Sequence, residues 1–204
     1  MEQLKARYPG KSQVTHMVVP DFTTGHAPFT EVVGERRFDD AVASHVIEHV
    51  PDFVGWLWNI WSVVKEKSVV SLAIPHAERT FDARRRQSSF GDAAEAYLGA
   101  FKRPSPAQII DAQTGIAAFH DKPNPLKTAF EAFRLANHVR QTGHYVDMHC
   151  WVFTPDSWRE ILRTMETYGL LGFELLDVID HGSDEFLVHL AKRPDWKRPD
   201  HLAL

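Results

Sequence analysis

Short apolar runs alternate with stretches of helical periodicity along the chain. The runs that predict strands, because they are rich in β-branched or aliphatic residues, are 14–19, 38–44 and 68–74. Between the last two runs, apolar residues recur at helical spacing from Val54 to Val64, and Asp52 precedes them as a helix cap. Pro75 ends the third strand. Strands that alternate with helices predict a layered α/β fold with a largely parallel sheet.

The alternation stops between residues 84 and 150. The clearest element there is a helix from Pro125 to Thr142, with Asn124 as its cap and Gly143 at its end. Its expected apolar face consists of Leu126, Ala129, Phe130, Phe133 and Ala136. An unstructured loop of this length is improbable in a compact domain. We therefore expect residues 84–150 to form a helical insert or lid within a single domain spanning residues 1–204.

The last third of the chain has the most regular pattern. Thr154 and Pro155 begin a helix that Gly169 ends. Two alternating runs, 173–180 and 185–192, predict strands. The short "HGSD" connection between them predicts an antiparallel pair.

Composition is that of an ordinary globular protein and narrows the function classes. The 204 residues are 44% hydrophobic and 25% charged, with a net charge of −4, which gives no support for binding to nucleic acid or to an anionic membrane. Cys150 is the only cysteine, so an internal disulfide is excluded. No apolar run approaches the roughly 20 residues of a membrane span, and the first residues lack the apolar region of a secretory signal. A cytoplasmic location is expected.

The stretch "SHVIEHVPD", residues 44–52, supports two interpretations. His45, Glu48 and His49 match the H-x-x-E-H pattern of inverted zinc proteases. That chemistry needs both histidines on one face of a helix, whereas Pro51 indicates that the helix only begins after them. The alternative is a ligand site at the carboxyl end of a strand, or simple capping of the next helix.

Two further polar clusters are weaker signals. In "HYVDMH", Asp147 and His149 share a face of an extended segment but His144 does not, so no metal site is expected there. The arginines 84–86, with Lys102 and Arg103, could hold an anionic acceptor, although a solvated face accounts for them.

Four segments, taken in order, resemble the second half of a class I S-adenosylmethionine-dependent methyltransferase: "FDDAVASHVIEHVPD", "SVVSLAIPHAERTFDARR", "HCWVFTPDSW" and "EFLVHLAK". The resemblance implies an incomplete Rossmann-like sheet made of the family's third to seventh strands. It implies S-adenosylmethionine as cofactor and a small-molecule or saccharide acceptor.

The resemblance also assigns roles to residues. Positions that match the cofactor side of the family's site are Asp21, Ser44 and His45. Positions that match groups able to act on the acceptor are Glu48, His49 and His149. Positions that match the segment where acceptors enter are Pro75, Arg79, Phe81 and Asp82. A histidine or glutamate at such a position can serve as general base for a hydroxyl.

The chain departs from the family at its beginning. It has no G-x-G-x-G turn, and it lacks the acidic residue that holds the ribose. We therefore expect a truncated unit in which cofactor binding is weak or absent, and an open sheet edge that gives a homo-oligomer or a poorly soluble monomer. A non-catalytic remnant serving as an interaction module and a zinc hydrolase remain the alternatives to methyl transfer.

Overall fold

The computed structural model describes residues 20–121, 124–197 and 199. In this part of the chain, a mixed four-stranded sheet packs against helices, so the α/β class is confirmed. The prediction of a largely parallel sheet is wrong for the described strands, because only one of their three pairings is parallel. The expected strand 14–19 lies outside the described residues. No described helix has the length and apolar character needed to cross a bilayer.

The sheet has the strand order β1-β2-β4-β3. Its strands are β1 (Ala41–Ser44), β2 (Val69–Pro75), β3 (Phe173–Asp180) and β4 (Glu185–Lys192). β1 is parallel to β2, while β4 runs antiparallel to both of its neighbours. The antiparallel pair at the end of the chain is therefore confirmed. β1 occupies one edge among the strands that the structure describes.

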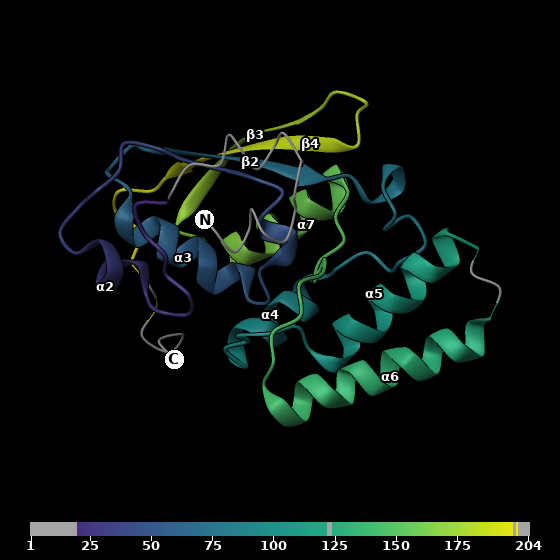
Figure 1. The fold of residues 1–204 in the computed structure, drawn as a ribbon. Helices are drawn as coiled ribbons and strands as arrows, with labels where there is room; N and C mark the ends of the chain where they lie inside the picture. Colours follow the sequence, from purple (N-terminus) through teal and green to yellow (C-terminus); the bar gives the residue numbers. More distant parts are fainter. Residues whose placement is uncertain (1–19, 122–123, 198, 200–204) are drawn as a thin grey trace, which may run out of the picture.

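Helices cover one face of this sheet (Figure 1). The helices are α2 (Phe29–Val33), α3 (Phe53–Val63), α4 (Phe90–Leu98), α5 (Pro106–Phe119), α6 (Pro125–Thr142) and α7 (Pro155–Thr167), with short 3-10 turns η2 (Ile47–His49) and η3 (Ala77–Arg79). The main core lies between the sheet and α3, α4 and α7. It is rich in aromatic side chains, and Phe53, Trp151, Phe153 and Trp158 are almost fully buried within it.

Local signals placed several helix ends correctly. The Asp52 side chain accepts a hydrogen bond from the Gly55 amide at the start of α3, and Asn124 does the same for Lys127 in α6. Gly143 ends α6 in the left-handed conformation that glycine adopts at low cost. The predicted bounds of α6 are confirmed.

The strand predicted at 38–44 is shorter than expected. Phe38 forms only an isolated bridge with Val64, and regular pairing begins at Ala41. The two intervening aspartates are otherwise engaged, because Asp40 accepts a hydrogen bond from the Val69 amide and Asp39 pairs with Lys65.

The segment 84–150 is largely helical, but its helices belong to two different cores. α4 packs into the main core through Ala93, Ala96 and Tyr97. The hairpin of α5 and α6 lies to one side (Figure 1) and encloses a second, small core. That core contains Ile109, Ala112, Ala136, Val139 and Met148. A lid function for this segment stays a prediction.

The predicted apolar face of α6 is wrong in part. Ala136 is buried against α5, but Leu126, Phe130 and Phe133 are 85%, 64% and 62% exposed. The buried residues of α6 are Ala132, Ala136 and Val139. Small side chains allow the two helices of the hairpin to pack closely. The large apolar residues are turned toward solvent.

Candidate functional site

A tight turn at the carboxyl end of β1 forms the centre of the candidate site. The His45 amide still bonds to Ala73 of β2, but His45 has a left-handed backbone with φ of 52°. This conformation is costly for a residue other than glycine and redirects the chain into the 3-10 turn η2. His45 and His49 therefore do not share a face of an α-helix, which removes the geometry that the inverted zinc protease pattern requires.

The turn directs the side chain of Glu48 into the protein. Glu48 is 2% exposed, and neither carboxylate oxygen accepts a hydrogen bond from any residue that the structure describes. Two imidazole nitrogens lie near one of these oxygens, Nδ1 of His45 at 3.6 Å and Nε2 of His49 at 3.7 Å. A buried carboxylate in such a setting is costly unless a cation neutralises it.

The backbone of Glu48 joins the turn to a distant segment. Its carbonyl oxygen accepts hydrogen bonds from the amides of Cys150, at 2.6 Å, and Trp151, at 3.3 Å. The Trp151 indole N–H also donates to the carbonyl of Val50 at 2.6 Å. These bonds place His149 beside η2.

His49 and His149 lie against each other, each oriented by a carboxylate. Their rings meet edge to face, with centroids 4.8 Å apart. Nδ1 of His49 donates to Asp147 at 2.8 Å, and Nδ1 of His149 donates to Asp82 at 2.6 Å. Because an ionised carboxylate can only accept, each Nδ1 carries a proton, and in the neutral ring Nε2 is the acceptor.

Asp82 belongs to a buried ionic network. Its other oxygen accepts from Arg85 at 2.8 Å, and Nε of Arg85 donates to Asp111 of α5 at 2.8 Å. Burial would raise the pKa of Asp82, but the hydrogen bonds from His149 and Arg85 outweigh it and hold this pKa below its usual range. Arg85 is thus buried, and the solvated face predicted for arginines 84–86 is wrong at this position.

A glycine in α5 makes room for the Arg85 side chain. A Cβ atom on Gly115 would lie 2.2 Å from Cγ of Arg85. The sequence offered no signal for this contact, because the two residues meet only when α5 packs on the segment that follows η3.

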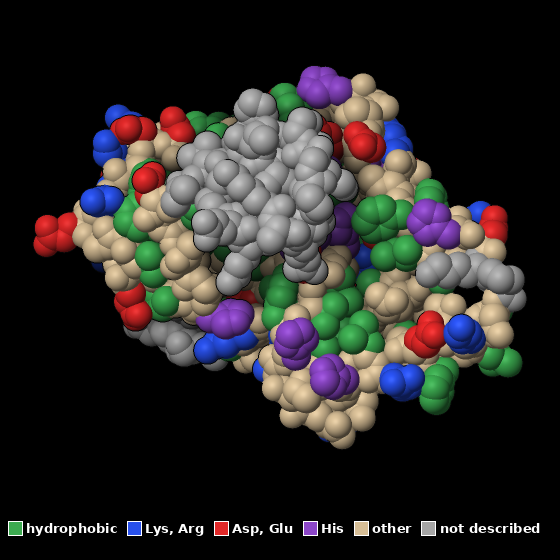
Figure 2. Space-filling model, in the orientation of Figure 1, with side chains coloured by type: hydrophobic (Ala, Val, Ile, Leu, Met, Phe, Trp, Pro, Cys, Tyr) green, Lys and Arg blue, Asp and Glu red, His purple; other side chains and the backbone are tan. Residues whose placement is uncertain are grey.

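A large cavity opens beside the turn. Its volume is about 820 Å³, within the range of sites for small molecules and cofactors. Apolar side chains that line it include Phe29, Val46, Trp56 and Phe101, and polar ones include His45, His49, Asn59, Tyr145 and Asp147. Histidine and hydrophobic side chains lie side by side on the face of the molecule shown in Figure 2.

The structure brings some predicted site residues together and separates others. His45 and His49 line the cavity, and Glu48 and His149 lie behind it. The Phe81 ring packs on His149 with centroids 4.7 Å apart. Ser44 ends β1, and exposed Asp21 is not among the residues lining the cavity.

Of the predicted acceptor-binding residues, Arg79 is engaged elsewhere. Its guanidinium donates to both carboxylate oxygens of Asp180, at 2.5 and 2.9 Å, and to the carbonyl of Ser183. Pro75 ends β2 nearby, paired with Glu185 of β4. Arg79 therefore holds the β3–β4 hairpin.

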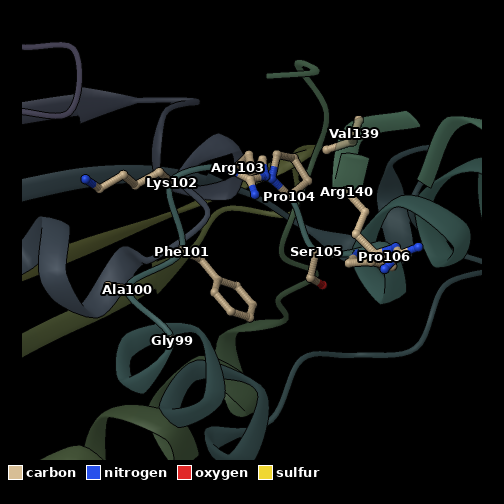
Figure 3. A pocket seen from close by; sticks show the side chains of 10 residues that line it. All are labelled: Gly99, Ala100, Phe101, Lys102, Arg103, Pro104, Ser105, Pro106, Val139 and Arg140. Atoms are coloured by element: carbon tan, nitrogen blue, oxygen red, sulfur yellow. The ribbon is translucent and has the colours of Figure 1, made fainter. Parts of the chain in front are cut away.

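A smaller cavity of about 300 Å³ lies between the loop after α4 and the end of α6 (Figure 3). The loop residues 99–106 line it together with Val139 and Arg140. The ring of Phe101 points toward Ser105, while Lys102 extends away from the cavity. This arrangement gives no convergent set of polar groups for an anion.

Neither family models, nor curated proteins, nor solved structures match this chain. Its function must therefore be inferred from its own residues and geometry.

Proposed function

We propose that the chain is a methyltransferase-like domain that takes S-adenosylmethionine as donor and a small-molecule or saccharide hydroxyl or carboxylate as acceptor. The observation that carries the proposal is the cavity of about 820 Å³ at the carboxyl end of β1, lined by the turn that resembles the methyltransferase family. Ligands of open α/β sheets bind at this end of the strands.

The sheet supports the same proposal. The resemblance implies a parallel pair followed by a closing antiparallel pair, and β1 and β2 are parallel while β3 and β4 are antiparallel. Because β1 and β2 are parallel, the two sequence segments of the expected site, 44–52 and 75–82, both follow the carboxyl ends of neighbouring strands.

The cavity residues fit part of the donor. The aromatic and aliphatic side chains of Phe29, Val46 and Trp56 offer a surface for a flat base, and Asn59 and His45 add polar groups. A glycine-rich turn and a carboxylate for the ribose are missing from the sequence. Each lost hydrogen bond to a charged group costs about 1.5–3 kcal/mol. Since about 1.4 kcal/mol is tenfold in affinity, two or three such losses would weaken a micromolar donor site to millimolar or worse.

When bound, the donor supplies an electrophilic methyl group. The chain's task is then to align the acceptor and, where the acceptor is a hydroxyl, to remove its proton. His49 is the candidate to accept that proton, because its side chain lines the cavity and Asp147 holds the ring through Nδ1. His149, whose Nδ1 is bonded to Asp82 in the same manner, packs against the His49 ring.

Binding of the donor can be tested through Trp56, whose side chain lines the cavity. We expect its indole NMR signal to shift with millimolar, not micromolar, S-adenosylmethionine or S-adenosylhomocysteine. Val46→Trp, which fills the cavity, should abolish the shift, while Val42→Trp on the exposed side of β1 should not. An unchanged Trp56 signal at millimolar donor would contradict the proposal.

The missing glycine turn favours a second candidate, a non-catalytic remnant that keeps the fold and acts as an interaction module. The same titration separates the two, because a remnant gives no shift that depends on the cavity. Methyl transfer from labelled donor to a panel of sugars and carboxylic acids then tests activity in the full chain.

A further inference from the structure

We propose that Glu48, His49 and His149 bind a divalent transition-metal ion, with Zn²⁺ as the best match. One ligand atom from each of the three residues lies within 4.8 Å of the others. Two imidazoles and one carboxylate form a donor set that proteins use for catalytic zinc and for non-haem iron. The site does not depend on the proposed methyl transfer.

The spacing is close to what a metal ion requires. With bonds of about 2.0 to 2.2 Å, ligand atoms around a tetrahedral ion lie about 3.3 Å apart. Nε2 of His49 is 3.7 Å from Oε1 of Glu48, so this pair needs a shift of only a few tenths of an ångström. The third ligand atom lies within 4.8 Å of the others and needs a movement of up to about 1.5 Å, which an imidazole at the surface of the core can make by rotating about its side-chain bonds.

The outer hydrogen bonds are those of metal-binding histidines. Such a histidine almost always donates its second ring N–H to a carboxylate or carbonyl, which fixes the tautomer and turns the other nitrogen to the metal. Asp147 does this for His49, and Asp82 does it for His149. In the neutral ring, Nε2 is the nitrogen that can bind a cation.

The burial of Glu48 is the independent observation that points to a ligand. Its carboxylate is 2% exposed and accepts no hydrogen bond from the described residues. Burial of an unpaired carboxylate costs several kcal/mol. A metal ion bound to Oε1 would remove this cost and convert the three residues into one stable cluster.

The competing explanation is an imidazolium at His45 or His49 that neutralises Glu48 without metal. His45 donates Nε2–H to Glu185 at 2.7 Å and faces Glu48 with Nδ1 at 3.6 Å. This explanation predicts no metal affinity, so direct binding measurements separate the two.

Three protein ligands leave one or more coordination positions open, as in catalytic rather than structural zinc sites. His49 lines the cavity, so the open position is accessible to a ligand in it. If the proposed function holds, the ion would bind the acceptor oxygen and promote loss of its proton, in place of His49 acting as base. This consequence rests on the proposed function, while the metal site does not.

The test uses the full chain. Elemental analysis measures the zinc content of protein purified without chelators, and calorimetry follows the titration of EDTA-stripped protein with Zn²⁺. We expect one zinc per chain. Glu48→Gln and His149→Gln should lose at least about tenfold in affinity, and Asp147→Asn should weaken binding by about 10- to 100-fold through the orientation of His49. His144→Gln, an exposed neighbouring histidine outside the cluster, should bind as the wild type does.

Two further measurements keep the result unambiguous. Circular dichroism of each metal-free variant checks that loss of binding is not loss of folding, and the visible spectrum of the Co²⁺ form reports nitrogen and oxygen ligation. His45→Ala should keep the ion. The proposal is overturned by the absence of stoichiometric zinc, by equal affinity in Glu48→Gln, or by loss of zinc in His45→Ala but not in His149→Gln.

Discussion

Asp82 accepts a 2.6 Å hydrogen bond from Nδ1 of His149, and its second oxygen accepts one from Arg85. Asp82→Asn removes the charge that both partners share, while Asp111 still pairs with Arg85. We expect a loss of about 2–4 kcal/mol in the free energy of unfolding, measured by urea denaturation. Asp156→Asn, at a 96% exposed side chain, is the control and should change it by less than about 0.5 kcal/mol.

The same carboxylate makes stability depend on pH. The folded-state pKa of Asp82 is lowered, so its contribution is present above the unfolded-state pKa of about 3.9 and is lost as the pH falls through the folded value. The difference in unfolding free energy between the wild type and Asp82→Asn should therefore shrink as the pH is lowered below about 4. A difference that is constant from neutral pH to acid would show that the charge of Asp82 contributes nothing.

Cys150 should be inert in the native protein. Burial raises the pKa of its thiol to about 12, and its Sγ lies 3.7 Å from the carbonyl of His49. We expect no labelling by an aromatic disulfide reagent at neutral pH and full labelling in denaturant. Labelling of the folded chain at the rate of a free thiol would mean that the segment around residue 150 opens readily.

The exposed aromatic side chains of α6 should matter less for stability than its small buried ones. Phe130→Ser should change the free energy of unfolding by within about 0.5 kcal/mol, because the side chain is already in solvent. Ala136→Leu should cost about 1–3 kcal/mol, because it overfills the contact with α5. Thermal denaturation of the two variants compares them directly. A larger loss of stability in Phe130→Ser than in Ala136→Leu would support the apolar face of α6 predicted from the sequence.

Among the strands that the structure describes, β1 pairs on one side only, and we expect its other edge to support self-association. The His45 amide donates to the carbonyl of Ala73 in β2. Because successive N–H groups along a strand point to opposite sides, the Ala43 amide also faces β2 and the Val42 amide faces away from it. We expect a dimer whose population rises with concentration in light scattering. Val42→Pro should shift it to monomer by removing that N–H, and Val42→Thr, which keeps it, should not. A wild-type chain that is monomeric at high concentration would contradict the prediction.

Elements whose signals are local were predictable from the sequence. Asn124 and Gly143 bound α6, and the alternation of apolar residues defines β3 and β4, because caps and periodicity depend only on neighbours in the chain. The face of α6 was not predictable, since its neighbour α5 selects small residues rather than large ones. Burial of Arg85 required knowledge that Gly115 lies against it.

The candidate site was predictable in its parts but not in its assembly. His49, Glu48 and His149 were each singled out from motifs, yet a spacing of 100 residues says nothing of contact. The roles of Asp82 and Asp147 as orienting carboxylates follow only from their distances to the two imidazoles. Arg79, expected beside an acceptor, instead binds Asp180, because η3 places it over the β3–β4 hairpin.

The hydrogen bonds from Cys150 and Trp151 to the carbonyl of Glu48 also constrain the order of folding. They close a loop of about 100 residues, and contacts of such separation form late, after local helices and hairpins. The α5–α6 hairpin lies within that loop and can form early from local contacts. In nascent chains that have not yet emerged beyond residue 151, the turn after β1 would therefore lack its partner segment. Ligand binding at this turn would begin only after that segment has been synthesised.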